Sequence, residues 1–228
     1  MLTPRVGLIF VRVGVVTFLV LVTGARPILA SNDFANYNFL VGSGFLCDTN
    51  DSTTCPAVAR APSGETIEVS GAGTLSLASK TITAAGAYTQ KSSSGELMAT
   101  GVWTATELLG FESYGIAPGS LMRQGPRFKA FRLLPLGLGM LAGPMPAGGL
   151  ALMRIRLLPD VGGPKDAILQ VNCAKGRVPE NRQGDGIRLA IQEGDGLKFD
   201  ERVSGRAIFM LNKPGLDVAS KHPASRSN

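Results

Sequence analysis

The chain has 228 residues, of which 44% are hydrophobic and 18% are charged, and its formal net charge is +6. This length suits a single β-rich domain of ordinary size. The basic residues form no run of five or six, whereas nucleic-acid surfaces concentrate basic side chains and interleave them with aromatic ones. The composition therefore predicts no nucleic-acid partner.

Residues 1–30 have the pattern of a secretory signal peptide. Arg5 and Arg12 precede the apolar run 13–22, and a short stretch that ends at Ala30 follows as the cleavage region. This run is too short to cross a bilayer, which needs about 20 residues. We expect cleavage after Ala30, no spanning membrane segment after signal removal, and a secreted or periplasmic protein. Removal of residues 1–30 lowers the formal charge from +6 to +3, and a retained N-terminal anchor is the alternative.

The three cysteines are interpreted through this expected export. Cys47 and Cys55 bracket a polar loop, so in an oxidising compartment we expect them to form a disulfide. Cys173 lies on the apolar face of the segment 167–173, where a cysteine behaves as a small buried hydrophobe. Pairing of Cys173 with one of the other two remains an alternative at this stage.

Apolar and polar residues alternate in short segments along most of the chain, which is typical of β-strands, and no window has a helical apolar stripe. The segments 65–70 and 74–79 begin this series, and the run 80–90 contains Gly86, which indicates a bulge or a close backbone approach. The segment 97–106 follows. The residues expected on the inner faces of 65–70, 74–79 and 97–106 are Ile67, Val69, Leu75, Leu77, Leu97, Ala99, Trp103 and Ala105.

Further strands are expected at 150–158, 166–173, 187–193, 197–203 and 205–212. Short turns between successive strands favour an all-β fold, a single antiparallel β-meander that is barrel-like, with a two-sheet β-sandwich as the alternative. The predicted organisation is a signal peptide (1–30), an N-terminal segment with the Cys47–Cys55 loop (31–63), an antiparallel β domain (64–212) and a disordered polar tail (213–228).

The segment 133–149 is apolar but is interrupted by Gly and Pro at nearly every second position. Pro removes a backbone donor and Gly costs conformational order, so the segment is predicted to be a long loop and not a strand. The interpretation that the pattern favours is a loop that packs on the end of the β-structure or is disordered. The functional alternative is a lid over an apolar cavity, or a tip that contacts a membrane or a partner. The candidate contact residues are Leu136, Leu138, Met140, Leu141 and Met145.

Arginines on the polar sides of the later strands form a second candidate site. Arg154, Arg156 and Arg188 all project opposite the apolar faces of their segments. If these strands are neighbours, the three side chains would form an anion patch. A plain solvated sheet face is the interpretation that we favour for these arginines.

Several kinds of chemistry are excluded by what the chain lacks. Its only histidine, His222, lies in the expected tail, so no general base is available for a Ser-His-Asp or Cys-His site, and a site with several histidine ligands cannot form. Glu107 and Glu112 are the carboxylates that we considered for glycoside hydrolysis. We predict no catalytic residues, no metal ligands and no cofactor.

Three functions follow from these observations. The first is an exported, non-enzymatic β-domain that binds a small apolar ligand or a surface partner through the segment 133–149. The second is an exported hydrolase that uses carboxylates, and the third is a structural envelope protein. The lack of a histidine and of a clustered Asp/Glu motif argues against the enzyme.

Overall fold

Antiparallel strands make up almost all the regular structure in the computed structural model, which describes residues 35–48, 51–117, 144–192 and 196–212. The strands are β1 (Asn36–Val41), β2 (Ala57–Arg60), β3 (Thr66–Ser76), β4 (Thr81–Lys91), β5 (Leu97–Ile116), β6 (Met145–Pro159), β7 (Lys165–Cys173), β8 (Gly186–Ile191), β9 (Lys198–Phe199), β10 (Glu201–Ser204) and β11 (Ala207–Asn212). The described residues also include three single-turn 3₁₀ helices: η1 (Gly44–Leu46), η2 (Ser52–Thr54) and η4 (Glu180–Arg182). The all-β class is confirmed.

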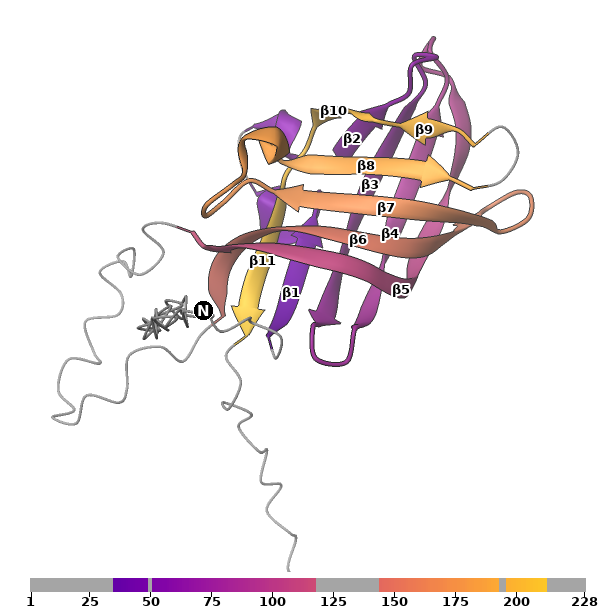
Figure 1. Ribbon diagram of the computed structural model, residues 1–228. Coiled ribbons are helices and arrows are strands. Elements are labelled where there is room, and N and C mark those ends of the chain that lie inside the picture. The colour runs from indigo at the N-terminus through magenta and orange to yellow at the C-terminus, as the bar shows by residue number, and fades with distance from the viewer. Residues whose placement is uncertain (1–34, 49–50, 118–143, 193–195, 213–228) are drawn as a thin grey trace, which may run out of the picture. The chain divides into compact units, whose positions relative to one another are not determined.

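The strands form one continuous antiparallel sheet whose central part closes on itself. From β2 to β9 each strand pairs with the next, which is the predicted meander. β1 and β11 pair with each other and also with β3 and β6, so β1, β3, β4, β5, β6 and β11 form a closed ring. Figure 1 shows β5 to β8 crossing in front of β1, β3 and β4. The barrel-like expectation therefore holds for this ring.

The first strands join the same sheet as the rest. β1 pairs with β3 and β11, and β2 pairs with β3 and β10, so the region 31–63 contributes two strands to the β domain and is not a separate segment. The expected disulfide joins Cys47 to Cys55, whose Cα atoms are 5.4 Å apart. The expected signal peptide and tail lie outside the described residues, within which no helix is both long and apolar enough to span a membrane.

Inward-facing side chains fill the space inside the ring. The period-two pattern is confirmed for β3, β6 and β7, where alternate apolar residues are buried. Phe111 lies 4.7 Å from Tyr37 and 5.1 Å from Phe209 between ring centroids. The largest fully buried side chains are Trp103, Tyr37, Phe39, Phe199, Phe209, Ile67, Leu75, Met153, Ile155, Leu157, Leu169 and Ile187. The interior is thus a packed apolar core.

Trp103 is accommodated by two glycines on the neighbouring strands. Trp103 on β5 pairs with Gly86 on β4, and Gly86 pairs in turn with Gly71 on β3. A Cβ atom added to Gly71 would lie 2.5 Å from the indole, and one added to Gly86 would lie 2.7 Å from its Nε1. The close backbone approach predicted at Gly86 is therefore confirmed: the Ser70 carbonyl and the Gly71 Cα of β3 lie closest to it, and the indole lies next to them.

The alternation predicted that Leu97 shares the inner face with Trp103, and this prediction is wrong. Leu97 is 64% exposed, whereas Trp103 is fully buried. The reason is a β-bulge: Lys91 of β4 pairs with Leu97 and Gln90 pairs with Ala99, so Met98 is the extra residue. One inserted residue moves the side chains before it to the opposite face.

The predicted loop 133–149 ends earlier than expected, because its last residues belong to β6. Met145 begins this strand and pairs with Leu211 of β11, so it is not part of a loop. Pro146 is tolerated because it lies near the start of the strand, where a missing N–H donor disturbs the sheet least. Its carbonyl still accepts from Ala117 N–H at 2.9 Å. Gly148 permits close contact with Lys175. The other candidate contact residues, Leu136, Leu138, Met140 and Leu141, lie outside the described residues.

Cys173 is a buried free thiol, as expected of the third cysteine. Its Sγ donates to the Ala147 carbonyl at 3.6 Å, and burial raises the pKa of the thiol to about 11. We expect the folded, unreduced protein to resist alkylation by iodoacetamide at neutral pH, because the thiolate is the reactive form. After unfolding without reductant, mass spectrometry should find one alkylated cysteine. Three alkylated cysteines would contradict the disulfide, and rapid labelling of the folded protein would contradict the burial.

Candidate anion-binding site

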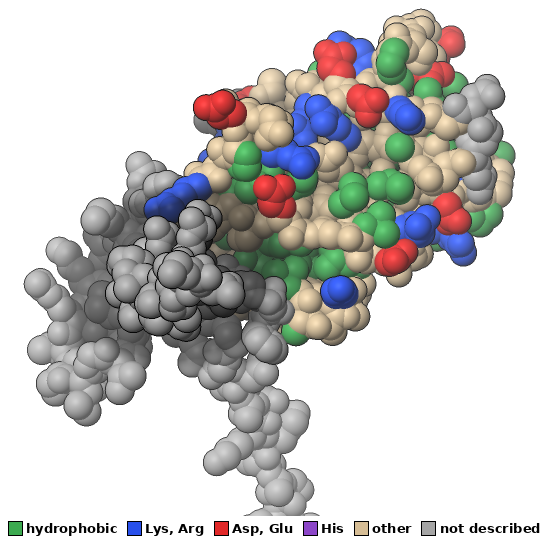
Figure 2. Space-filling view, in the orientation of Figure 1, with side chains coloured by type: hydrophobic (Ala, Val, Ile, Leu, Met, Phe, Trp, Pro, Cys, Tyr) green, Lys and Arg blue, Asp and Glu red, His purple; other side chains and the backbone are tan. Residues whose placement is uncertain are grey.

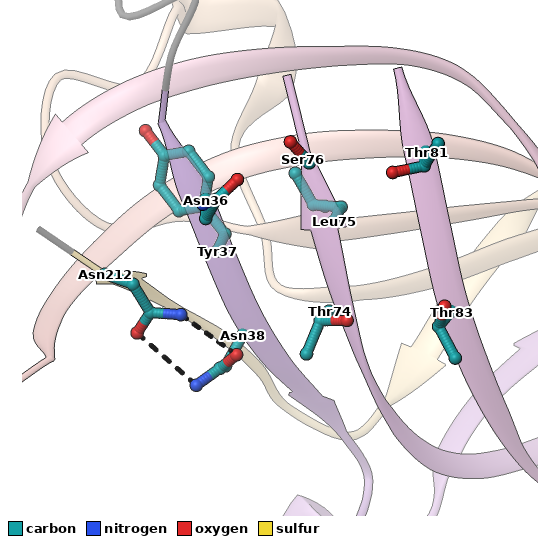
Figure 3. A pocket seen from close by; sticks show the side chains of 9 residues that line it. All are labelled: Asn36, Tyr37, Asn38, Thr74, Leu75, Ser76, Thr81, Thr83 and Asn212. Atoms are coloured by element: carbon teal, nitrogen blue, oxygen red, sulfur yellow. Dashed lines mark hydrogen bonds between the residues drawn. The ribbon is translucent and has the colours of Figure 1, made fainter. Parts of the chain in front are cut away.

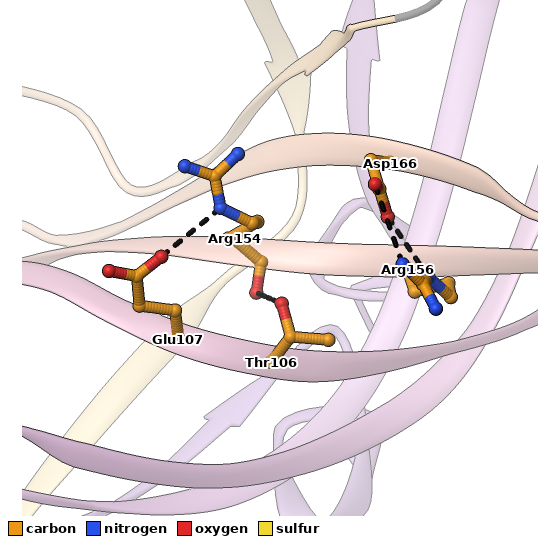
Figure 4. Close-up of polar contacts among 5 residues, drawn as sticks. All are labelled: Thr106, Glu107, Arg154, Arg156 and Asp166. Atoms are coloured by element: carbon orange, nitrogen blue, oxygen red, sulfur yellow. Dashed lines mark hydrogen bonds and ion pairs between the residues drawn. The ribbon is translucent and has the colours of Figure 1, made fainter.

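The structure divides the three arginines that the sequence grouped into an anion patch. All three lie on outward-facing positions of β6 and β8, but Arg154 pairs with Glu107 at 3.1 Å and Arg156 pairs with Asp166 at 3.0 Å (Figure 4). Arg188 lies two strands away from β6, and its Nε donates to the backbone carbonyl of Asp200 at 2.7 Å. Figure 2 shows positive and negative side chains interspersed on this face. Arg154 and Arg156 are thus engaged by carboxylates, and Arg188 belongs to a different environment.

That environment is a hollow of about 430 Å³ at the outer surface, between β8 and β10. We call it the arginine hollow. Two arginines from different strands, Arg188 of β8 and Arg202 of β10, both line it. Its full lining is Gln183, Gly184, Asp185, Arg188, Asp200, Glu201, Arg202, Val203 and Ser204.

One wall of the hollow, the segment 183–185, is held together with the preceding Arg182 by a buried polar network. Tyr114 donates its hydroxyl hydrogen to Asn172 Oδ1 at 2.9 Å. The amide of Asn172 donates to the carbonyls of Arg182 at 2.9 Å and of Gly184 at 2.6 Å. Because Asn172 is fully buried on β7, these bonds fix the wall relative to the sheet.

Arg202 forms the other side of the hollow and is half-buried. Burial lowers the pKa of its guanidinium, and the nearby charges of Arg188 and Arg182 lower it further, although Tyr114 and Asp185 oppose them. Its Nε is buried without a hydrogen-bond partner among the described residues. A buried N–H donor without an acceptor is rare and costs free energy, so an acceptor at this position would be favourable.

Three acidic residues also line the hollow, and the carboxylates of two of them have other partners. Asp185 accepts from the backbone N–H of Ala174 through Oδ1, and Glu201 pairs with Arg60 at 3.4 Å. Asp200 contacts Arg188 through its backbone carbonyl. Within the described part of the chain, neither Arg188 nor Arg202 forms an ion pair with a carboxylate. Two guanidinium groups therefore line one hollow with no carboxylate of the described residues at ion-pair distance, and Asp185 acts on Arg202 only from further away.

Sequence reasoning did not find Arg202. It stands in the segment Asp200–Val203, where adjacent acidic residues suggest an ordinary solvated strand. Its position depends on the pairing of β10 with β2, in which Arg202 is opposite Ala59. No local pattern records a pairing between segments so far apart along the chain.

The carboxylates considered for hydrolysis are not brought together as a free pair. Glu107 pairs with Arg154, and Glu112 lies 3.8 Å from Arg182. Each is thus engaged by an arginine on the outer surface, and neither is among the residues that line the arginine hollow. Among the described residues, no cluster of three or more His, Cys, Asp or Glu side chains could hold a metal ion.

Comparison with known proteins adds no relative: no family model, no curated protein and no solved structure matches this chain. The class to which it belongs is therefore defined by its own features. It is an antiparallel β domain with a closed six-strand ring and a surface hollow lined by two arginines.

Proposed function

We propose that this protein is an exported, non-enzymatic binding domain that holds its ligand or partner by an oxyanion in the arginine hollow. The observation that carries the proposal is the pair Arg188 and Arg202, which line one hollow without a carboxylate partner among the described residues. A carboxylate, phosphate or sulfate group supplies the acceptor oxygens that a guanidinium binds best, through short charge-assisted hydrogen bonds.

A binding role agrees better with the site than catalysis does. The described residues that line the hollow include no histidine, cysteine or lysine, and two of its carboxylates already have partners: Asp185 accepts from Ala174 N–H and Glu201 pairs with Arg60. The packed core leaves the outer surface as the favoured place for a ligand. Export is supported by the disulfide, which is typical of oxidising compartments.

Binding of an oxyanion should depend on Arg202. We expect Arg202→Gln, which keeps a polar side chain of similar shape but removes the charge, to weaken binding of inorganic sulfate roughly tenfold or more, since a hydrogen bond to a charged group contributes about 1.5–3 kcal/mol. The measurement is an NMR titration of the mature protein with sulfate, repeated with phosphate and acetate to rank the three oxyanions. Binding should also weaken as sodium chloride is added.

The matched control is Arg154→Gln, because Arg154 is ion-paired with Glu107 and lies outside the hollow. This variant should bind sulfate as tightly as the unaltered protein does. Equal losses of affinity in the two variants would show a nonspecific charge effect and would contradict the proposal, as would an absence of sulfate-induced shifts in β8 and β10.

The predicted contact through the apolar segment is a separate proposal. Its described flanks, Ile116 and Met145, end β5 and begin β6, and Ile116 is exposed. Because β6 begins at Met145, a deletion that tests the segment should be confined to residues 136–143 and should spare the strand.

A further inference from the structure

A second hollow, of about 260 Å³, lies on the outer face of a different part of the ring, and no charged side chain lines it. We call it the amide–hydroxyl face. Its side chains come from β1, β3, β4 and β11 (Figure 3). Tyr37 and Leu75 also line it, but their side chains are buried in the core on the inner side of the sheet. The polar residues around them are Asn36, Asn38, Thr74, Ser76, Thr81, Thr83 and Asn212.

The strand register places these polar side chains in two parallel rows. One row runs from Thr81 through Ser76 to Asn36, and continues to Asn212. The other row runs from Thr83 through Thr74 to Asn38. Neighbours within a row are about 4.8 Å apart and the rows are about 6.8 Å apart, because these are the spacings of a β-sheet. The face is therefore a regular array of hydroxyl and amide groups.

The two asparagines at the edge of the array are oriented by each other. Asn38 Nδ2 donates to Asn212 Oδ1 at 3.4 Å, and Asn212 Nδ2 donates to Asn38 Oδ1 at 3.1 Å (Figure 3). This reciprocal pair uses one N–H and one oxygen lone pair of each amide. Since a primary amide has two N–H donors and two lone pairs, each side chain retains one donor and one acceptor for a ligand.

The chemistry of the face selects among classes of ligand. A charged ligand finds no opposite charge in the lining. An apolar ligand would cover hydroxyl and amide groups without replacing their hydrogen bonds to water, which costs free energy. A neutral ligand with many hydroxyl groups can both donate to and accept from this array, and a chain of repeating sugars presents such groups at intervals that several positions can use together.

The outward positions beside this face have a different chemistry. Those of β5 and β6 include the ion pair of Arg154 with Glu107 and exposed apolar side chains such as Val102 and Leu152, and β3 and β4 carry the ion pair of Glu68 with Lys91 further along. The amide–hydroxyl face is the part of this surface whose lining is polar and uncharged. We propose that the amide–hydroxyl face is a binding site for a neutral carbohydrate chain, independent of the arginine hollow.

The test is an NMR titration of the mature protein with two neutral probes, maltohexaose and cellohexaose. At least one should shift the backbone amide signals of β1, β3 and β4, with a millimolar dissociation constant, because the hollow is open and the hydrogen bonds are uncharged. The double variant Thr74→Val and Thr83→Val removes two hydroxyl groups but keeps β-branched side chains that suit strands. It should bind roughly tenfold more weakly.

The matched control is Thr104→Val, which removes an exposed hydroxyl from β5 outside the face. It should leave carbohydrate affinity unchanged, and circular dichroism should show that all variants remain folded. The proposal is overturned if neither neutral probe shifts these signals, or if Thr104→Val weakens binding as much as the double variant. It is also overturned if polygalacturonate, a charged probe, binds this face more tightly than the neutral ones.

Discussion

Trp103→Ala should lower the free energy of unfolding by about 3–5 kcal/mol, the usual cost of truncating a buried aromatic side chain to alanine. Trp103 is fully buried, and its Nε1 donates to the Ser70 carbonyl at 3.1 Å. The loss is expected at the upper end of this range, because Gly71 and Gly86 beneath the indole have no side chains that could move into the cavity.

The measurement is urea unfolding followed by circular dichroism, since the variant lacks the only tryptophan and therefore its fluorescence. Val102→Thr is the matched control: Val102 is adjacent on β5 but 51% exposed, and both residues suit a strand. The control should change stability by less than about 0.5 kcal/mol. A Trp103→Ala loss as small as that of the control would mean that the indole is not part of the core.

The sequence predicted the features that depend on local alternation. Within the predicted strand 150–158, Met153, Ile155 and Leu157 face the core, because a strand buried on one face must place alternate residues inward. The close approach at Gly86 was also predictable, since a glycine within a strand often marks a bulge or a position where another backbone comes close. Leu97 was misplaced because a bulge depends on the pairing of two strands, and the sequence of one strand does not record it.

The candidate sites were less predictable because they depend on contacts between distant segments. Arg188 was identified as a candidate, but Arg202 was not, because only the pairing of β10 with β2 brings it to the hollow. The same limit applies to Asn38 and Asn212, whose side chains bond across the pairing of β1 with β11. Neither residue type is distinctive in sequence, and each becomes informative only beside its partner.

The disulfide loop stabilises the strand that carries Arg202. Thr53 and Thr54 of η2 accept hydrogen bonds from Gly205 N–H at 2.7 Å and Arg206 N–H at 3.0 Å. Arg206 also lies 3.6 Å from Asp51 within the loop. Because Gly205 and Arg206 directly follow β10, the loop closed by Cys47 and Cys55 holds the C-terminal end of that strand.

Replacement of both bridging residues, Cys47→Ser with Cys55→Ser, should lower the free energy of unfolding by about 2.5 kcal/mol, the loop-closure entropy expected for so short a loop. The midpoint of thermal unfolding should fall by roughly 5–10 °C. Sulfate binding should weaken as well, because a less ordered loop leaves β10 and Arg202 less well positioned. Calorimetry and the NMR titration measure the two effects separately.

A reducing agent provides the control for this variant. Dithiothreitol should lower the stability of the unaltered protein by the same amount and should leave the double variant unchanged, because only the former has a disulfide to lose. If the reductant affects both proteins equally, the disulfide does not account for the difference. If stability falls but sulfate affinity does not, the loop stabilises the fold without positioning Arg202. The prediction that the disulfide supports binding in the arginine hollow would then be wrong.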